Sequence, residues 1–357
     1  MTKTAHLPAE YGRLLRRKRL LLAAVLTALL AAMLAAVCLG SIALSPWEVV
    51  RTLLGGGAEQ SRTVVFGIRL PRVVSAVLVG AILGSSGAVM QCVLHNPLAS
   101  ASTLGVSQGA GFGAALGIIV FGGGVVHSSS SGAAVEIGRP GVVTLCAFVF
   151  GLLTTLAILA LSQLRRRLGA GGLVLAGVAL SSLFSGGSTL LQYFADDAQI
   201  GAVVFWTFGN LGGTGWTENA ALAAALAGSL LYFFWNRWRY NAMGAGTEAA
   251  QGLGVNARMV MLAGMAVSSL AVSAAVSFVG IIGFVGLIAP HMMRRLIGED
   301  YRFLIPGSAA AGALLLIAAD TFGRMAVAPV VLPVGAITSF VGAPVFLVLL
   351  WKGANRR

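Results

Sequence analysis

Charged residues are scarce in this chain. Asp, Glu, Lys and Arg make up only 10% of its 357 residues, whereas a soluble domain carries about 25%. Hydrophobic residues make up 57%, and they are grouped into runs of about 20, the length that crosses a hydrocarbon core of roughly 30 Å. A surface with so little charge cannot face water over most of its area. The composition therefore excludes a soluble protein and predicts an all-α, polytopic membrane protein.

Residues with reactive or ligating side chains are scarce too. The chain has three lysines, none of which follows a glycine, so it contains no G-x-x-x-x-G-K-[ST] phosphate loop. Its three cysteines stand singly in apolar runs, and neither an HExxH motif nor a Cys/His cluster is present. The sequence therefore predicts no metal site, no cofactor and no enzymatic activity. Any ATP hydrolysis would belong to a separate partner.

Ten apolar segments are predicted to span the membrane. They cover residues 20–44, 64–93, 103–124, 140–163, 171–195, 218–236, 257–279, 281–297, 303–326 and 333–352. With the N-terminus in the cytoplasm, 18 Lys and Arg residues fall inside and 6 outside, which is the charge bias that orients membrane proteins. We therefore expect both termini in the cytoplasm, a basic N-terminal segment at 1–19 and one transmembrane domain at 20–357. The net charge of +13 lies between the spans and implies no nucleic acid partner.

Small residues and two long connections stand out within this pattern. Gly80/Gly84, Gly109/Gly113 and Gly113/Gly117 have the GxxxG spacing of close helix contacts, although 48 glycines also produce it by chance. Residues 194–216, on the outer side, are predicted to hold a short helix at the mouth of the protein. Residues 237–258 form the longest cytoplasmic connection, and a connection of that length in a compact protein is usually functional.

Two serine motifs raise the alternative of a protease. Residues 105–109 match G-x-S-x-G, and residues 84–87 match the G-x-S-G of rhomboid-type intramembrane proteases. The first motif needs a strand before its serine, and we expect no strand in this chain. The second needs a histidine at the depth of Ser86. The candidates, all placed near the membrane surfaces, are His95, His127 and His291. We therefore interpret Ser86 and Ser107 as packing residues.

An ion-coupled secondary transporter is the stronger alternative. Such carriers place an ionisable group near mid-membrane, whereas every acidic residue here falls near a predicted span end. Asp320 lies deepest, and Arg324 follows it at the i,i+4 spacing of a helical ion pair. We interpret the two as a structural pair at the outer end of the ninth span. A transporter without its own energy site needs an external motor, and residues 237–258 are where a motor could act.

Several stretches resemble one known family. They are RLPRVVSAVLVGAILGSSGAVMQCVLHNPLASASTLGVSQGA (69–110), GLGVNAR (252–258), GFVGLIAPHMMRRLIGEDYRFLIP (283–306) and ADTFGRMAVAPVVLPVGAITSFVGAPVFLVLLWK (319–352). They are similar to the FecCD-type permeases of ABC importers for ferric siderophores, haem and cobalamin. The resemblance implies ten helices, a second permease subunit (here a homodimer), two cytoplasmic ATPases, and a substrate-binding protein outside. It also implies a multi-pass protein surrounded by lipid in a bacterial or archaeal plasma or inner membrane.

The resemblance also assigns roles to individual residues. Asn96-Pro97 closes the second span, since proline disfavours helix in the residue before it, and this turn matches the cytoplasmic gate. The expected gate residues are Asn96, Leu98, Gly169 and Ala170. The residues expected to dock the binding protein are Arg69, Arg72 and Arg324. The residues expected to couple to the ATPase are Gly252, Leu253, Gly254, Asn256 and Arg258.

The cargo expected from this resemblance is an iron(III)–siderophore complex. Iron uptake is the commonest task of the family, and that base rate is the only ground for the choice. Importers of haem and cobalamin share the same motifs, so these cargoes stay open as alternatives.

Overall fold

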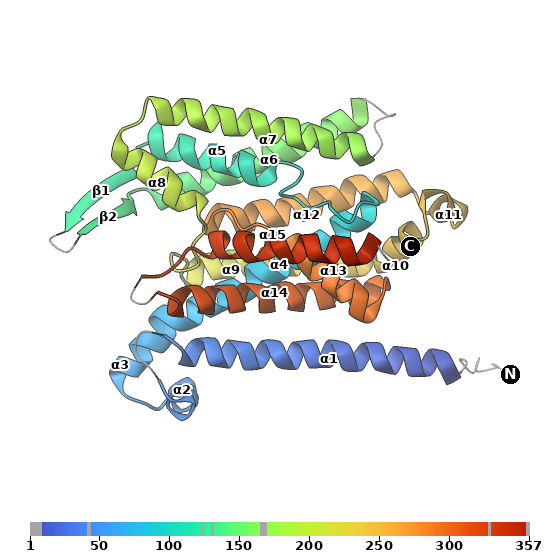
Figure 1. Cartoon of the computed structure of the whole chain (residues 1–357), viewed down its shortest axis with the longest axis horizontal. Coiled ribbons are helices and arrows are strands. Elements are labelled where there is room, and N and C mark those ends of the chain that lie inside the picture. Colours follow the sequence, from blue (N-terminus) through green and yellow to red (C-terminus); the bar gives the residue numbers. More distant parts are fainter. Residues whose placement is uncertain are drawn as a thin grey trace.

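The computed structural model describes residues 9–40, 44–122, 124–129, 132–164, 170–327 and 330–354. Almost all of them are helical (Figure 1). In chain order the elements are α1 (Ala9–Cys38), α2 (Pro46–Leu53), α3 (Glu59–Arg62), the π-helical η1 (Thr63–Arg69), α4 (Leu70–Val93), α5 (Val106–Ile119), β1 (Gly124–Ser129), β2 (Gly132–Ile137), α6 (Pro140–Leu164), α7 (Ala170–Tyr193), α8 (Asp197–Thr207), α9 (Trp216–Trp235), α10 (Arg237–Gly244), α11 (Thr247–Gly252), α12 (Ala257–Val279), α13 (Val285–Ile297), α14 (Tyr301–Met325) and α15 (Val334–Ala354).

The helical membrane fold predicted from the sequence is confirmed. Each of the ten predicted spans coincides with a helix: α1, α4, α5, α6, α7, α9, α12, α13, α14 and α15. In the described part of the chain, six helices are long and apolar enough to cross a membrane, namely α1, α3 to α4 as one rod, α6, α7, α12 and α14. The number of ten spans stays a prediction, because helices such as the 13-residue α13 are shorter than a bilayer requires.

Two features differ from the sequence expectation, namely the start of α1 and a hairpin. α1 begins at Ala9 rather than at residue 20, because the leucines and arginines at 13–19 are good helix formers. The expectation of no strand is wrong, because β1 and β2 form an antiparallel hairpin with Gly124 paired to Ile137. Its valines favour an extended chain. The hairpin follows the G-x-S-x-G motif instead of preceding it, so the argument against a nucleophile elbow is unchanged.

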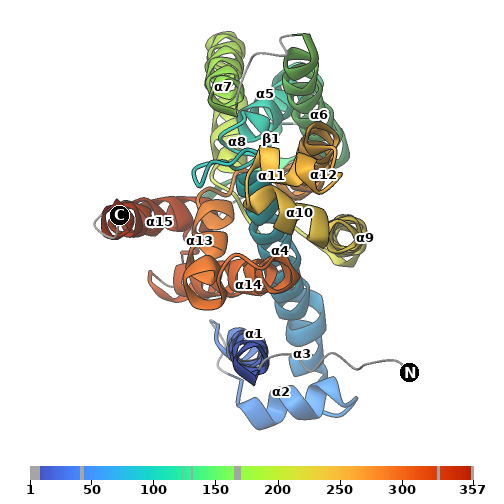
Figure 2. The same cartoon turned by 90° about the vertical axis from the view of Figure 1, so that its right-hand side faces the viewer.

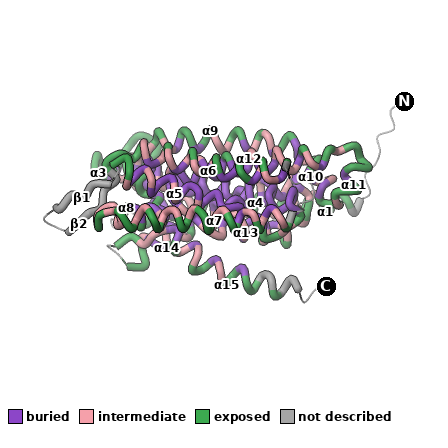
Figure 3. Tube along the Cα trace, turned by 90° about the horizontal axis from the view of Figure 1, so that it is seen from above, coloured by how far each residue is buried: buried purple, intermediate pink, exposed green. Residues whose placement is uncertain are grey.

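α4 is the central helix of the fold. It packs against α14, α13, α12 and α9 (Figure 2), and it is buried along most of its length (Figure 3). Gly80 and Gly84 permit this, since a Cβ at either position would overlap the backbone of α14. Gly109, Gly113 and Gly117 lie in the same way against α6. The GxxxG spacing seen in the sequence therefore marks real helix contacts, as is usual in lipid.

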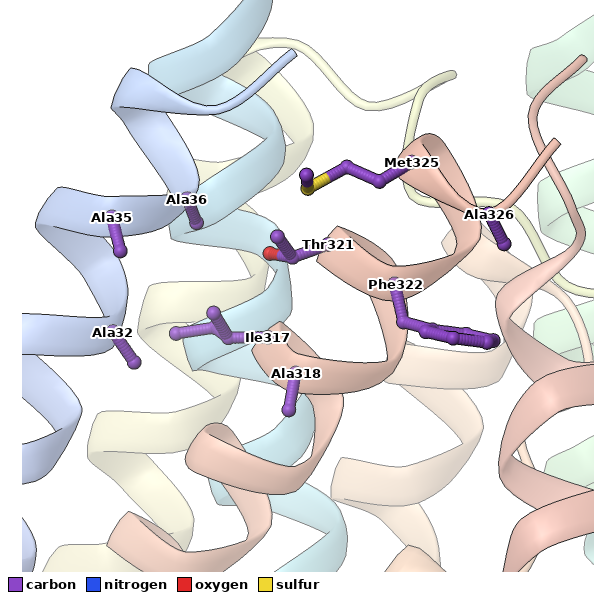
Figure 4. A pocket seen from close by; sticks show the side chains of 9 residues that line it. All are labelled: Ala32, Ala35, Ala36, Ile317, Ala318, Thr321, Phe322, Met325 and Ala326. Carbon is purple, nitrogen blue, oxygen red and sulfur yellow. The ribbon is translucent and has the colours of Figure 1, made fainter. Parts of the chain in front are cut away.

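α1 stands at the edge of the bundle and packs mainly on α14. A cleft of about 400 Å³ separates the two helices near one end, and Figure 4 shows the side chains that line it. Ala32, Ala35 and Ala36 face this cleft from α1, and Ile317 and Met325 face it from α14. The facing alanines are too small to fill the gap, so the packing between α1 and α14 is incomplete here.

The functional candidates lie at two opposite ends of the bundle. α2, α3, β1, β2 and α8 gather at one end, called the outer end here after the predicted orientation (Figure 1). α10 and α11 lie at the other, inner end, together with the start of α1 and the end of α15 (Figure 1). α8 is the short helix expected within 194–216. Which end faces the cytoplasm stays a prediction.

Candidate functional site

Three charged side chains meet at the outer end. Asp320 on α14 is only 3% exposed. Arg72, at the start of α4, donates from Nε to Oδ1 of Asp320 at 2.9 Å, and its second nitrogen, Nη2, lies 2.8 Å from the same oxygen. Arg324 donates from Nε to Oδ2 at 3.1 Å. The Asp320–Arg324 pair expected from spacing is therefore present. Arg72, 248 residues from Asp320, could not be found by spacing.

Two of the arginines also cap the outer end of α1. The last carbonyl groups of a helix have no helical hydrogen-bond donor, and cations there complement the helix dipole. The bonds run from Arg69 Nη1 to Val37 O (2.8 Å) and Cys38 O (3.0 Å), and from Arg324 to Leu39 O (Nη1, 2.9 Å) and Ala36 O (Nη2, 3.0 Å). These bonds supply the contacts that the cleft between α1 and α14 lacks.

The three arginines predicted for docking thus lie together, but they are already engaged. Arg69 is 6% exposed, and the side chains of Arg72 and Arg324 are 16% and 10% exposed. A partner carboxylate would have to compete with Asp320 and with the end of α1 for most of their donors. The docking role stays a prediction, and the structure adds a second role, which is to hold α1 against the bundle.

The turn after α4 is closed by backbone bonds. His95 N donates to Cys92 O at 3.1 Å and Asn96 N donates to Gln91 O at 3.2 Å, the pattern that ends many helices. His95 adopts φ 46°, a left-handed conformation that is uncommon outside glycine. Asn96 Oδ1 then accepts a bond from Leu98 N at 2.9 Å. The span therefore ends before Asn96-Pro97, as expected.

The predicted gate residues are only partly described by the structure. Leu98 is 41% exposed and Asn96 is half-buried, so both can contact another chain or a cargo. Gly169 lies outside the described residues. Ala170 is the first residue of α7, and its side chain is not described. A second constriction at these two positions stays a prediction.

A histidine joins the gate turn to the coupling connection. His95 Nε2 lies 2.9 Å from Met243 O, and Met243 is a buried residue of α10. Sequence reasoning considered His95 only as a protease candidate and missed this contact. The only local signal was its place between the end of an apolar run and Asn-Pro, which favours a tight turn.

The coupling connection ends in an exposed tip. After α11, Val255 N donates to Ala250 O and Gly254 N to Gln251 O, both at 2.9 Å. Gly254 has φ +78°, which glycine adopts without strain. Leu253 is 72% exposed and Gly252 is exposed as well. An exposed leucine on a rigid turn is suited to a partner groove, which agrees with the predicted coupling role.

The other two expected coupling residues anchor the base of this tip. Asn256 Oδ1 accepts a bond from Met259 N at 3.0 Å and so caps α12. Arg258 donates from Nη2 to Oε1 of Gln163 near the end of α6. The five residues therefore divide into an exposed tip at 252–254 and two anchors, a division that the sequence did not reveal.

An ion cluster lies beside α10 at the inner end. Asp300 accepts a bond from Arg302 Nη2 at 2.7 Å and lies 3.9 Å from Lys18 of α1. Asn241 of α10 donates to it at 3.3 Å. Burial alone would raise the pKa of Asp300, but the bonds from Arg302 and Asn241 outweigh it, so this pKa lies below its usual value. The cluster, also missed in the sequence, links α1 to the coupling connection.

The serine motifs lie in packed helices. Ser107 Oγ is 3.0 Å from Ser102 Oγ, and the buried hydroxyl of Ser86 has no hydrogen-bond partner within the described ranges. None of the hydrogen bonds found among described residues joins a histidine to either serine. The same part of the chain holds no group of three or more His, Cys, Asp or Glu side chains that could bind a metal ion.

Known proteins are similar to this chain in both sequence and fold. The profile of the FecCD transport family matches residues 28–352. A Methanocaldococcus jannaschii protein named as an ABC transporter permease is 49% identical, over 98% of this chain and 99% of that protein. The hemin transport system permease of Yersinia pestis is 34% identical, over 95% and 97%. Relatives at 36% and 33% identity are named for vitamin B12 import in Salmonella typhi and iron(3+)-citrate import in Bacillus subtilis.

A solved structure agrees with these relatives. An inward-facing structure named as a metal-chelate type ABC transporter superposes with a TM-score of 0.80 at 28% identity, covering 93% of this chain and 99% of that one. Proteins of this kind are the membrane-spanning transport subunits of ABC transporters and not enzymes. The family match extends over the arginine cluster, the Asn-Pro turn and the coupling tip, and the chain belongs to the FecCD transport family.

Proposed function

We propose that this permease subunit moves an iron(III)–siderophore complex from an extracytoplasmic binding protein into the cytoplasm of a bacterial or archaeal cell. The observation that carries the proposal is the family match over residues 28–352. Relatives named for iron(3+)-citrate and iron(3+)-hydroxamate support an iron chelate as cargo. Relatives named for hemin and vitamin B12 make haem or cobalamin the alternative.

The binding protein would dock on the outer arginine cluster. Arginine suits this role, because its planar fork holds a carboxylate through two parallel hydrogen bonds. In the free permease Asp320 occupies this fork on Arg72. An acidic side chain of the binding protein would share or displace that contact and would thereby also act on Arg324, which holds the end of α1.

A second copy of the chain would complete the pathway. α7 and α15 lie on the outside of the bundle (Figure 2), and they expose large apolar side chains. These include Leu183 (65%), Leu190 (66%) and Phe340 (84%). Leu98 and Asn96 would then face their counterparts across the dimer axis as a cytoplasmic gate. Cysteines at these two positions should crosslink in one nucleotide state more than in another, and equal yields in all states would rule out this gate.

ATP would be hydrolysed by a partner ATPase seated on residues 252–254. The exposed Leu253 and the rigid turn at Gly254 support this contact. Asn256 and Arg258 would transmit its movement to α12 and α6 through the bonds described above.

The test of the whole proposal is reconstituted transport. The permease, its neighbouring ATPase and its binding protein are placed in proteoliposomes, and uptake of ⁵⁵Fe-siderophores, hemin and cobalamin is measured with ATP inside or outside. The matched control is an ATPase variant that binds ATP without hydrolysing it. ATP-dependent iron–siderophore uptake supports the proposal. Uptake of only hemin or only cobalamin would show that this compound is the cargo instead. Uptake without the ATPase would overturn the importer mechanism.

A further inference from the structure

A cavity of about 680 Å³ lies at the outer end, beside the arginine cluster. It is enclosed by the start of α6, α8, the loop at 209–213, the end of α12 and the loop at 331–333. Small-molecule sites in proteins usually measure about 300–1,000 Å³ and combine apolar walls with a few placed polar groups. The cavity therefore has the size of a site for an organic ligand, and it is larger than one carboxylate side chain would fill.

One nitrogen of Arg72 is available to this cavity. Nε and Nη2 of Arg72 are engaged by Asp320, whereas Nη1 has no hydrogen-bond acceptor among the described residues. Arg72 and Gly212 both line the cavity, and a Cβ at Gly212 would lie 2.9 Å from Nη1. Glycine at this position thus leaves the guanidinium edge uncovered.

The remaining walls suit a ligand with an organic body and a negative charge. Asn210 Oδ1 accepts a bond from Gly212 N at 2.8 Å, which leaves the side-chain nitrogen of Asn210, Nδ2, as a second donor. Phe205 and Phe208 are 60% and 40% exposed, and their rings meet edge to face at 6.1 Å. No Asp or Glu is among the described residues that line the cavity. The negative charge of Asp320 balances only one of the two positive charges of Arg72 and Arg324, so the adjoining cluster keeps a net positive charge.

We propose that this cavity is a receiving site for an anionic metal chelate, with Arg72 Nη1 and Asn210 holding its acidic oxygens and the phenylalanine rings contacting its organic part. Arg72 then connects two events at the outer end, because the same guanidinium contacts Asp320 and the ligand. The inference rests on the proposed transport function, and it adds that the cargo class is negatively charged.

Gly213 offers a test that leaves the arginine cluster intact. It lines the cavity, and a Cβ there would meet no heavy atom within 4 Å. Gly213→Asp and Gly213→Asn have the same size and differ only in charge. Thr217→Asp, at an exposed position on α9 outside the cavity, adds the same charge elsewhere on the outer side. Thermal unfolding in detergent verifies that all variants fold.

The measurement is equilibrium binding to permease in nanodiscs, without ATPase or binding protein. The probes are ferric citrate and hemin, which are anions, and cyanocobalamin, which has no net charge. We expect the anionic probes to bind the wild type and to bind Gly213→Asp about tenfold more weakly than Gly213→Asn, which is a difference of ~1.4 kcal/mol. For cyanocobalamin the two Gly213 variants should have nearly equal affinities. Thr217→Asp should bind all three probes as the wild type does.

Other outcomes overturn the proposal. Equal affinities of Gly213→Asp and Gly213→Asn for the anions, or no binding of either anion to the wild type, would exclude an anion site. The binding protein is titrated onto the same nanodiscs in a separate experiment, and if the two variants differ only in affinity for it, the cavity receives a carboxylate of that partner instead. ATP-driven uptake in the reconstituted importer is measured in parallel. If the wild type takes up the chelate, a negative binding result contradicts only this inference. If the wild type shows no ATP-driven uptake, the proposed function is contradicted.

Discussion

His95 Nε2 and the backbone oxygen of Met243 lie 2.9 Å apart. The contact joins the turn at the end of the central helix to α10, the first helix of the coupling connection. His95 is held there with φ 46°, and a left-handed residue other than glycine persists only where its surroundings fix it. This contact thus joins the connection that holds the proposed ATPase contact to the turn that holds the proposed gate.

Removing the histidine should uncouple transport. In His95→Ala the bond to Met243 is lost, which costs about 0.5–1.5 kcal/mol of stability, and we expect ATP-driven uptake to fall several-fold while the assembled importer still hydrolyses ATP. His95→Asn is the matched variant, because asparagine tolerates the left-handed conformation but is too short to reach Met243. Both variants should lose coupling. Normal uptake by either one would show that the contact is only structural.

Arg69 should serve both α1 and docking. Arg69→Ala removes one donor from each of the carbonyls of Val37 and Cys38, so we expect faster amide hydrogen exchange in the last turn of α1 and weaker binding of the binding protein. Arg62→Ala, at an exposed arginine of the same outer side, is the control. If exchange in α1 does not change, the capping role is wrong. If Arg69→Ala, Arg72→Ala and Arg324→Ala all bind the binding protein normally, docking occurs elsewhere.

Asp320 should be important for stability. Asp320→Asn leaves Arg72 and Arg324 facing each other without the carboxylate that both contact. Breaking a buried ion pair on one side typically costs about 3–5 kcal/mol, so thermal unfolding in detergent should occur at a clearly lower temperature. Combining Asp320→Asn with Arg72→Gln should restore part of the loss. A single variant as stable as the wild type would contradict this assignment.

The coupling tip can be tested without straining its turn. Leu253 is exposed and has an ordinary backbone conformation, so Leu253→Glu should fold normally and yet lower ATPase binding or uncouple hydrolysis from uptake. Gly254→Ala probes the turn itself, because φ +78° costs a residue with a Cβ roughly 1–2 kcal/mol. Met259→Glu, at an exposed apolar residue just beyond the tip (69% exposed), is the control. Normal coupling in Leu253→Glu would show that the tip is only a linker.

The inner ion cluster should make stability depend on pH. The pKa of Asp300 is lower in the folded chain than its usual value of about 3.9, so its contribution is complete above that value and is lost as the pH falls through the folded pKa. Asp300→Asn should therefore lower the unfolding temperature at pH 7, and the gap to the wild type should narrow below about pH 4. A gap that is constant between pH 7 and pH 3 would exclude this linkage.

The sequence by itself determined the helices, because burial in lipid is a local requirement. Each apolar run becomes a helix, since a backbone in hydrocarbon must satisfy its own hydrogen bonds. The Asp320–Arg324 pair and the turn at Asn96-Pro97 also followed from neighbours within a few residues. The pairing of β1 with β2 was missed, because the valines and small residues of these strands show no clear period of their own.

Tertiary packing alone decided which distant groups meet. Arg72 reaches Asp320 because α4 crosses α14 where Gly80 and Gly84 let the backbones approach. His95 reaches Met243 of α10, and Arg69 reaches the end of α1, in the same packed bundle. Many glycines in this chain have the same spacing, so the sequence could not show which ones set the crossing. The cavity beside Arg72 has the same origin, because its walls come from helix ends and loops that only the packed bundle brings together.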